Sequence, residues 1–142
     1  MGQEFIAKAE TIIGVSPAKV WAALTDPEIV KERLFGTTVV SNWQVGSPLI
    51  YKGEWEGNAY EDKGTILEII PEKILSSTYW SEMSGLPDLP ENYQKVTYKL
   101  SAVPNGTRLS ITQENVKTEE SQNHSGENWA KVLTGLKNLL EK

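Results

Sequence analysis

The feature that most constrains the fold of this chain is a change in its hydrophobic period. Between Thr38 and Gln113, apolar side chains recur mainly at every second position, which is typical of strands with one packed face. After Thr118 the period becomes 3.6, and the predicted helix carries one apolar stripe: Trp129, Val132, Leu133, Leu136, Leu139 and Leu140. Because such a helix must bury its stripe, we expect an α+β fold in which the last helix packs across a curved sheet.

The residues before this region predict one strand and two short helices. Residues 5–13 are rich in β-formers and are followed by Gly14. Ser16-Pro17 and Asp26-Pro27 each combine a capping side chain with a proline suited to the first helical position, and the second helix should run towards Arg33.

Six further strands are predicted between residues 38 and 113. Turn-forming residues separate them, and the strand in the middle should run from Thr65 to Ile70. Asn105-Gly106 is a strong hairpin signal between the last two strands. The predicted order is β-α-α-β-β-β-β-β-β-α, and the short connections favour antiparallel neighbours.

Composition limits the classes of function. The chain has 142 residues, close to the usual size of one domain, so we expect residues 1–142 to form a single domain. It has no cysteine and one histidine, which excludes disulfides and a thiolate metal site, and we expect neither metal nor cofactor. A net charge of −5 disfavours nucleic-acid and membrane partners. With no export signal or membrane span in view, we expect a cytoplasmic protein.

Several segments resemble one superfamily over essentially the whole chain. Residues 16–27 resemble the opening helix of the START and birch-pollen-allergen superfamily, known as SRPBCC, and residues 64–75 resemble a central hairpin of one branch of it. Residues 106–112 and 129–140 resemble that branch's last strand and helix. The branch is similar to the C-terminal domain of the activator of heat shock protein 90 ATPase. The resemblance implies a helix-grip fold, often with a pocket between the sheet and the C-terminal helix.

The resemblance also sets an expectation about chaperones. The eukaryotic activator has a large N-terminal domain that supplies much of its chaperone grip, and nothing comparable precedes residue 5 in this sequence. We therefore do not expect its co-chaperone activity to carry over.

Aromatic and polar residues of the sheet and last helix are candidates for a ligand site. Apolar walls with a few polar groups are what small-molecule sites need. The predicted lining is Tyr51, Trp55, Tyr79, Tyr98, Gln113, Trp129 and Leu133. The alternative interpretation is that the aromatic residues only fill the core.

No residues are predicted to be catalytic. His124 is interpreted as a solvated residue near the start of the last helix. The adjacent carboxylates Glu61 and Asp62 would point to opposite faces of a strand, so they cannot act as a facing pair, and we interpret them as hairpin surface. There is no Ser/His/Asp set and no phosphate-binding loop.

Three functional hypotheses follow. We favour a non-enzymatic protein that binds a small apolar or aromatic ligand between sheet and helix. The first alternative is a module that binds a chaperone or another protein through the exposed sheet face or the 81–92 loop, which carries Met83, Leu86 and Leu89. The second is an enzyme of the cyclase or hydrolase type found elsewhere in the superfamily, which would need a polar group with a perturbed pKa in the cavity.

Overall fold

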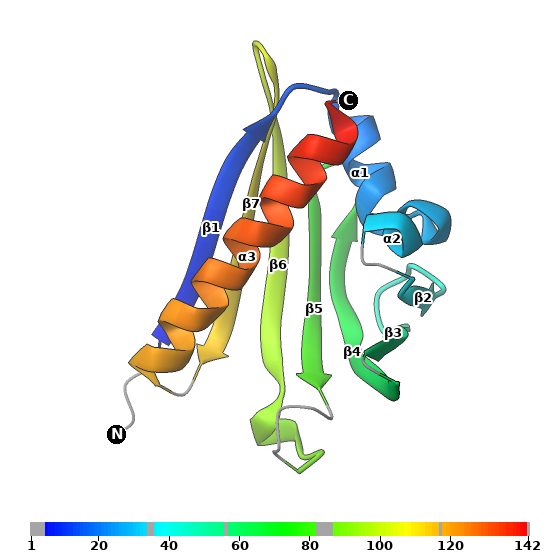
Figure 1. Ribbon diagram of the computed structural model, residues 1–142, viewed down its shortest axis with the longest axis vertical. Coiled ribbons are helices and arrows are strands. Elements are labelled where there is room, and N and C mark those ends of the chain that lie inside the picture. The colour runs from blue at the N-terminus through cyan, green and yellow to red at the C-terminus, as the bar shows by residue number, and fades with distance from the viewer. Residues whose placement is uncertain (1–4, 34–35, 56, 82–86, 117, 142) are drawn as a thin grey trace.

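The computed structural model describes residues 5–33, 36–55, 57–81, 87–116 and 118–141. These residues form three α-helices, seven strands and a short 3-10 helix in the predicted order (Figure 1). The helices are α1 (Pro17–Thr25), α2 (Pro27–Arg33) and α3 (Glu119–Leu140), with the 3-10 turn η2 at Pro90–Asn92. The strands are β1 (Phe5–Ile13), β2 (Thr38–Ser41), β3 (Pro48–Trp55), β4 (Asn58–Ile70), β5 (Ile74–Ser81), β6 (Gln94–Val103) and β7 (Gly106–Val116).

All seven strands form one antiparallel sheet. Its order is β1-β7-β6-β5-β4-β3-β2, so β1 and β2 are the two edges. In Figure 1, α3 runs diagonally across one face of the sheet beside β1, while α1 and α2 lie near one end of it. The predicted α+β class and helix-grip fold are confirmed. We call the face covered by α3 the inner face.

The ends of the helices follow from local chemistry. The Ser16 hydroxyl accepts a hydrogen bond from the Lys19 amide, and Pro17 occupies the first helical position of α1. At the start of α3, the Thr118 hydroxyl accepts from the Ser121 amide at 3.0 Å. Glu119 and Glu120 in the first turn of α3 also suit the positive end of the helix dipole. The helix starts are therefore encoded locally.

One end of the inner face is a close-packed aliphatic core. Ile13, Leu109 and Ile111 from the strands have no solvent exposure. They belong to the same cluster as Leu133 and Leu136 from α3, which are 2% and 1% exposed. Burying such side chains contributes about 1.5–3 kcal/mol each. These two leucines are the buried centre of the apolar stripe predicted on the last helix.

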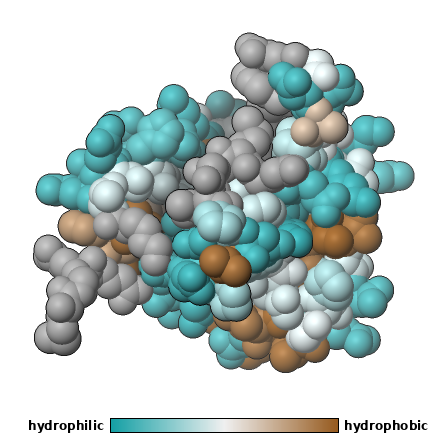
Figure 2. Space-filling view, turned by 90° about the horizontal axis from the view of Figure 1, so that it is seen from below, coloured by the Kyte–Doolittle hydropathy of each residue, from teal (hydrophilic) through white to brown (hydrophobic). Residues whose placement is uncertain are grey.

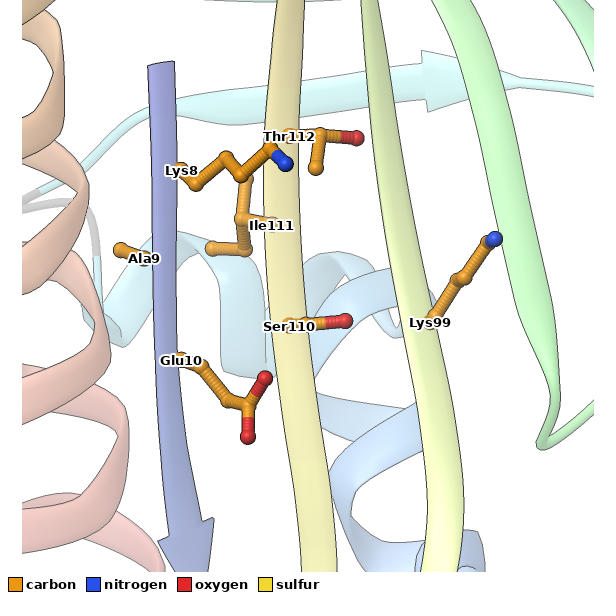
Figure 3. Close-up of a pocket in the computed structure, with 7 residues that line it drawn as sticks. All are labelled: Lys8, Ala9, Glu10, Lys99, Ser110, Ile111 and Thr112. Atoms are coloured by element: carbon orange, nitrogen blue, oxygen red, sulfur yellow. The ribbon is translucent and has the colours of Figure 1, made fainter. Parts of the chain in front are cut away.

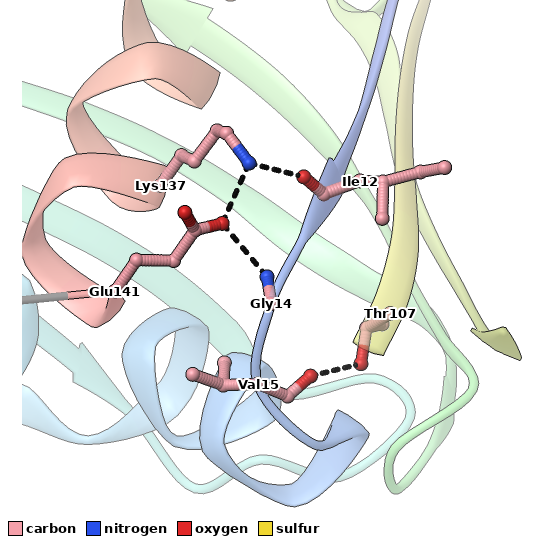
Figure 4. Close-up of polar contacts among 6 residues, drawn as sticks. All are labelled: Ile12, Gly14, Val15, Thr107, Lys137 and Glu141. Atoms are coloured by element: carbon pink, nitrogen blue, oxygen red, sulfur yellow. Dashed lines mark hydrogen bonds and ion pairs between the residues drawn. The ribbon is translucent and has the colours of Figure 1, made fainter. Parts of the chain in front are cut away.

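Side chains of α3 also cover the free edge of β1. The Gln122 amide donates to the Ile6 carbonyl and the Lys137 ammonium donates to the Ile12 carbonyl, both at 2.8 Å. Figure 4 shows the second contact together with Glu141, which accepts from the Gly14 amide at 2.7 Å and from Lys137 at 2.6 Å. Unpaired edge groups invite pairing with other chains, and these contacts satisfy them.

The sequence prediction was wrong about one strand. β4 begins at Asn58 rather than Thr65, and residues 58–65 pair with β3 over its whole length. Charged residues and Gly64 lower the intrinsic strand preference of this stretch, but pairing with β3 on one side and β5 on the other overrides it. This correction moves residues 60–63 from a hairpin surface into the centre of the sheet.

Candidate functional site

The other end of the inner face carries polar and aromatic side chains instead of aliphatic ones. Paired residues of neighbouring antiparallel strands share a face, so the register places Tyr51, Asp62 and Ser81 in one row. Tyr79 and Gln94 form the next row. Leu49 and Leu75 lie an even number of residues from Tyr51 and Tyr79 on the same strands, so they share this face. Both leucines are buried, which identifies the face as the inner one. In Figure 1 this end of β4 and β5 extends beyond α3. We call it the polar end.

A tyrosine and an aspartate are hydrogen-bonded at the polar end. The Tyr79 hydroxyl donates to Asp62 Oδ2 at 3.1 Å. Burial, followed by the negative charge of Asp62, raises the pKa of Tyr79 above its usual value, so the phenol keeps its proton. The other carboxylate oxygen, Oδ1, is buried and has no hydrogen-bond partner. Asp62 is therefore a half-buried residue of β4 with one covered oxygen, so its interpretation as hairpin surface was wrong, while Glu61 is exposed on the opposite face as expected.

Two glutamines connect the last helix to the sheet. The Trp129 indole N–H donates to Gln113 Oε1 at 2.8 Å, and Gln113 Nε2 donates to Gln94 Oε1 at 2.5 Å. Gln113 is only 7% exposed, so these bonds satisfy an amide that would otherwise be costly to bury. The Trp129 ring also meets Tyr98 edge to face, with ring centres 6.1 Å apart. The chain of contacts fixes one wall of the polar end.

The structure places the seven residues proposed from the sequence in different settings. Trp129 contacts both Gln113 and Tyr98, as described. Tyr51 and Tyr79 lie on the same inner face and are half-buried against the core. Leu133 is fully packed in the core, as is most of Tyr98, so these two act more as support than as lining. Trp55 pairs through its backbone with Asn58, and its side chain lies outside the described part.

Sequence reasoning missed Asp62, Ser81 and Gln94. The signal for Asp62 was present, because Tyr60, Asp62, Gly64 and Ile66 alternate in step with the strand that follows. Starting the predicted strand at Thr65 left Asp62 outside that alternation. Ser81 and Gln94 gave no comparable signal, since each lies at a strand end whose position depends on the loop between β5 and β6.

A separate hollow lies on the outer face of the sheet. Its volume is about 450 Å³. Figure 3 shows residues that line it: Lys8 and Glu10 on β1, Ser110 and Thr112 on β7, and Lys99 on β6. Ala9 points to the other side of β1 from Lys8 and Glu10. The side chains of Lys8, Glu10 and Lys99 are charged and those of Ser110 and Thr112 are hydroxylic, and the hollow is open to solvent. It lacks the enclosed apolar walls that small apolar ligands require.

Exposed apolar side chains are dispersed. Seen from the polar end, hydrophobic residues form separate areas among hydrophilic ones (Figure 2). Among the described residues, the large apolar side chains that are more than two-fifths exposed lie on three strands and in two connections: Ile12 on β1, Val40 on β2, Leu67 and Ile70 on β4, and Val45 and Leu89 between strands. Of the loop proposed as a contact surface, Met83 and Leu86 lie outside the described residues. Scattered single residues of this kind do not define an interface.

Other candidate chemistry is sparse in the described residues. His124 lies exposed on α3, in agreement with its interpretation as a solvated residue. No group of three or more His, Cys, Asp or Glu side chains among the described residues is placed to hold a metal ion. In the same part of the chain, no helix is both long and apolar enough to cross a membrane.

Comparison with known families agrees with this architecture. Residues 14–141 match the family described as "Activator of Hsp90 ATPase homolog 1-like protein", which is a family of the SRPBCC type. This chain belongs to that family. The resemblance noted in the sequence is thereby confirmed, and it extends over α1, the central strands and α3.

Solved structures of relatives share the fold of this member. A protein of Cytophaga hutchinsonii is 50% identical, with a TM-score of 0.87 over 99% of this chain and 97% of that one. A protein of Mesorhizobium loti is 25% identical, with a TM-score of 0.73 over 96% of each chain. The Aha1 dimer of Colwellia psychrerythraea is 24% identical, with a TM-score of 0.74 over 96% of each chain, and it shows likeness of fold alone. No curated protein matches the chain.

Proposed function

We propose that this family member binds a small apolar or aromatic molecule between the inner face of the sheet and α3, at the polar end. The observation that carries the proposal is the contrast in packing along the inner face. Tyr51, Tyr79 and Trp129 are large aromatic residues that remain half-buried next to a fully packed core. Aromatic walls with a few placed polar groups favour small organic ligands.

The polar groups at this end support the same proposal. Gln94, Gln113 and Trp129 hold each other in fixed positions, so the wall is ordered before any ligand arrives. Preorganised walls lower the ordering cost of binding. A bound aromatic molecule would gain affinity from burial at about 25 cal/mol per Å² before those costs.

Native mass spectrometry of the freshly purified protein tests the proposal first. A reproducible extra mass that leaves on denaturation supports it and weighs the ligand. If the protein is isolated bare, binding of aromatic probes can be followed through tryptophan fluorescence. A bare mass together with no response to any apolar or aromatic probe would contradict the proposal.

A matched pair of variants locates the site. Tyr51 and Lys52 are neighbours on β3 that point to opposite faces. We expect Tyr51→Ala to weaken probe binding on the order of ten-fold, as loss of a buried aromatic contact would. Lys52→Ala should leave binding unchanged. Equal effects of the two substitutions would place binding elsewhere.

A second candidate function is interaction with a chaperone. It is favoured by the family match alone, since the family's name refers to activation of the Hsp90 ATPase. A pull-down of purified Hsp90 at low salt tests it, because weak charged contacts survive best there. Stimulation of the Hsp90 ATPase in the same sample would support this candidate, and absence of both binding and stimulation would exclude it.

A further inference from the structure

One buried oxygen at the polar end has no partner. Among the described residues, Asp62 Oδ1 is the side-chain polar atom that is both buried and without a hydrogen bond. Leaving a buried acceptor unsatisfied typically costs about 1–3 kcal/mol, and more for a charged group. Buried polar groups in native proteins are nearly always paired, so an exception at a candidate site calls for a functional reading.

Among the described residues, the side chains around Asp62 supply one hydrogen bond and no positive charge. Tyr79 donates to Oδ2, and the Ser81 hydroxyl is hydrogen-bonded to Tyr79 in turn. Lys63, the next residue along β4, points to the outer face, where it forms an ion pair with Asp88 at 2.6 Å. Within the described part of the chain, no Lys, Arg or His lies within ion-pair distance of Asp62.

The position of the carboxylate matches the proposed site. Asp62 lies in register with Tyr51 on one side and Ser81 on the other, on the face that carries the half-buried aromatic residues. A molecule that enters beside Tyr51 and Tyr79 brings its polar group to this row. Oδ1 is covered in this structure, so a ligand's donor reaches it only when the side chains around it move apart. The new hydrogen bond then offsets part of the free-energy cost of that movement.

From this geometry we infer that Asp62 selects ligands bearing a hydrogen-bond donor, an N–H or O–H group, at one end of an apolar or aromatic body. The inference rests on the proposed function and names its ligand class. Asp62 Oδ1 accepts the donor, Tyr79 holds the carboxylate through Oδ2, and the aromatic side chains contact the body. A ligand of the same shape without a donor leaves Oδ1 unsatisfied and binds more weakly.

Three naphthalene probes of similar size test the inference with the wild-type chain. 2-Naphthol carries an O–H donor, 2-naphthylmethylamine carries an ammonium group, and 2-methoxynaphthalene carries no donor. Dissociation constants are measured by tryptophan fluorescence and checked by calorimetry. We expect at least one donor-bearing probe to bind about ten-fold more tightly than the methyl ether, since the bond is made to a charged acceptor. Preference for the amine or for the alcohol tells which donor class the site favours.

Variants assign the preference to Asp62. Asp62→Asn removes the charge with little change in shape and should reduce the preference for the donor to about two-fold or less. Glu61→Gln is the matched control, because Glu61 is the adjacent carboxylate on the outer face and should leave the preference intact.

The outcomes separate this inference from the proposed function. If all three probes bind the wild type equally, the Asp62 inference is overturned while the binding function stands. If none binds, both fall. If the preference survives in Asp62→Asn, the donor is recognised by another group and the inference is wrong. Because the wild-type comparison needs no variant, a folding defect in Asp62→Asn cannot obscure the result.

Discussion

The two ends of the inner face share the same sheet and the same long helix, yet they are built differently. At one end Ile13, Leu109 and Leu136 are at most 1% exposed and belong to the core cluster. At the other end the aromatic residues Tyr79 and Trp129 are hydrogen-bonded, Trp129 to the Gln113 amide. Aliphatic packing contributes stability but does not distinguish one ligand from another. Polar groups held in fixed positions form directional hydrogen bonds, which can distinguish ligands. We expect the aliphatic end to carry most of the stability, and the proposed function assigns recognition to the polar end.

The largest effect should come from the place at the polar end where two backbones nearly touch. A Cβ added at Gly64 would lie 1.7 Å from the Thr78 carbonyl oxygen, so β4 and β5 would have to separate. We expect Gly64→Ala to lower the free energy of unfolding by about 4 kcal/mol or more, measured by urea denaturation. Gly135→Ala is the control, since nothing lies within 4 Å of its added Cβ and alanine favours the helix. A loss of less than about 1 kcal/mol would resemble the effect of an ordinary surface substitution, and it would refute the close contact.

Shortening a core leucine should test the stability of the aliphatic end. Leu136 is 1% exposed, and Leu136→Ala should cost about 3 kcal/mol through lost burial and the cavity that remains. The measurement is urea unfolding, combined with probe binding under conditions where the variant stays folded. We expect stability to fall while the affinity of the folded protein hardly changes. Parallel losses of stability and affinity would mean that the two ends are not separable.

Breaking the glutamine chain should have an intermediate effect. Gln113→Met keeps the length of the side chain but leaves the Trp129 indole N–H and Gln94 without their partner. We expect a loss of about 1–3 kcal/mol and faster exchange of the Trp129 indole proton, followed by NMR. The exposed Gln44→Met change is the control. An unchanged exchange rate would show that the bond does not hold Trp129 in solution.

The alkaline stability of the protein should report the buried phenol. The pKa of Tyr79 is raised, so above pH 10 the unfolded chain loses this proton while the folded chain retains it. The contribution of Tyr79 to the free energy of unfolding is therefore fully present below the unfolded pKa. Above that pKa it declines by at most about 1.4 kcal/mol per pH unit. In Tyr79→Phe, the free energy of unfolding should decline less steeply between about pH 9 and 11. The difference in slope should be at most about 1.4 kcal/mol per pH unit. Superimposable wild-type and variant profiles would contradict burial beside Asp62.

The smallest effect is expected where Glu141 accepts from Lys137 and from the Gly14 amide, a contact that we call the C-terminal tie. The Lys137 ammonium and the Gly14 amide lower the pKa of Glu141, so its contribution is present above the unfolded pKa and lost as the pH falls through the lowered folded value. Glu141→Gln should speed hydrogen exchange at the Gly14 amide with little change in global unfolding, because the group is exposed. Glu127→Gln, exposed on the same helix, is the control. No change in Gly14 exchange would show that the tie is not maintained in solution.

The comparison between the two ends also shows how far sequence reasoning reached. The switch of period from two to 3.6 gave the order of elements, and Ser16-Pro17 and Asn105-Gly106 marked a helix start and a hairpin, all confirmed. Tyr98, Gln113 and Trp129 were predicted from the sequence to line a ligand site, which stays a prediction, and the structure brings Trp129 into contact with the other two. Asp62 was interpreted together with Glu61 as hairpin surface, whereas the structure places it on the inner face of β4.

The sequence by itself determined which segments become helices and strands and which stripe of the last helix is buried. These properties depend on near neighbours in the chain, through capping, turn chemistry and period. Only the tertiary structure decided that Asp62 faces inward, because a shift of the β3–β4 register by one residue would turn it outward and bring Glu61 in. The meeting of Trp129 with Gln94 likewise depends on where α3 crosses the sheet, which is fixed by the packing of Leu133 and Leu136 and not by any local signal.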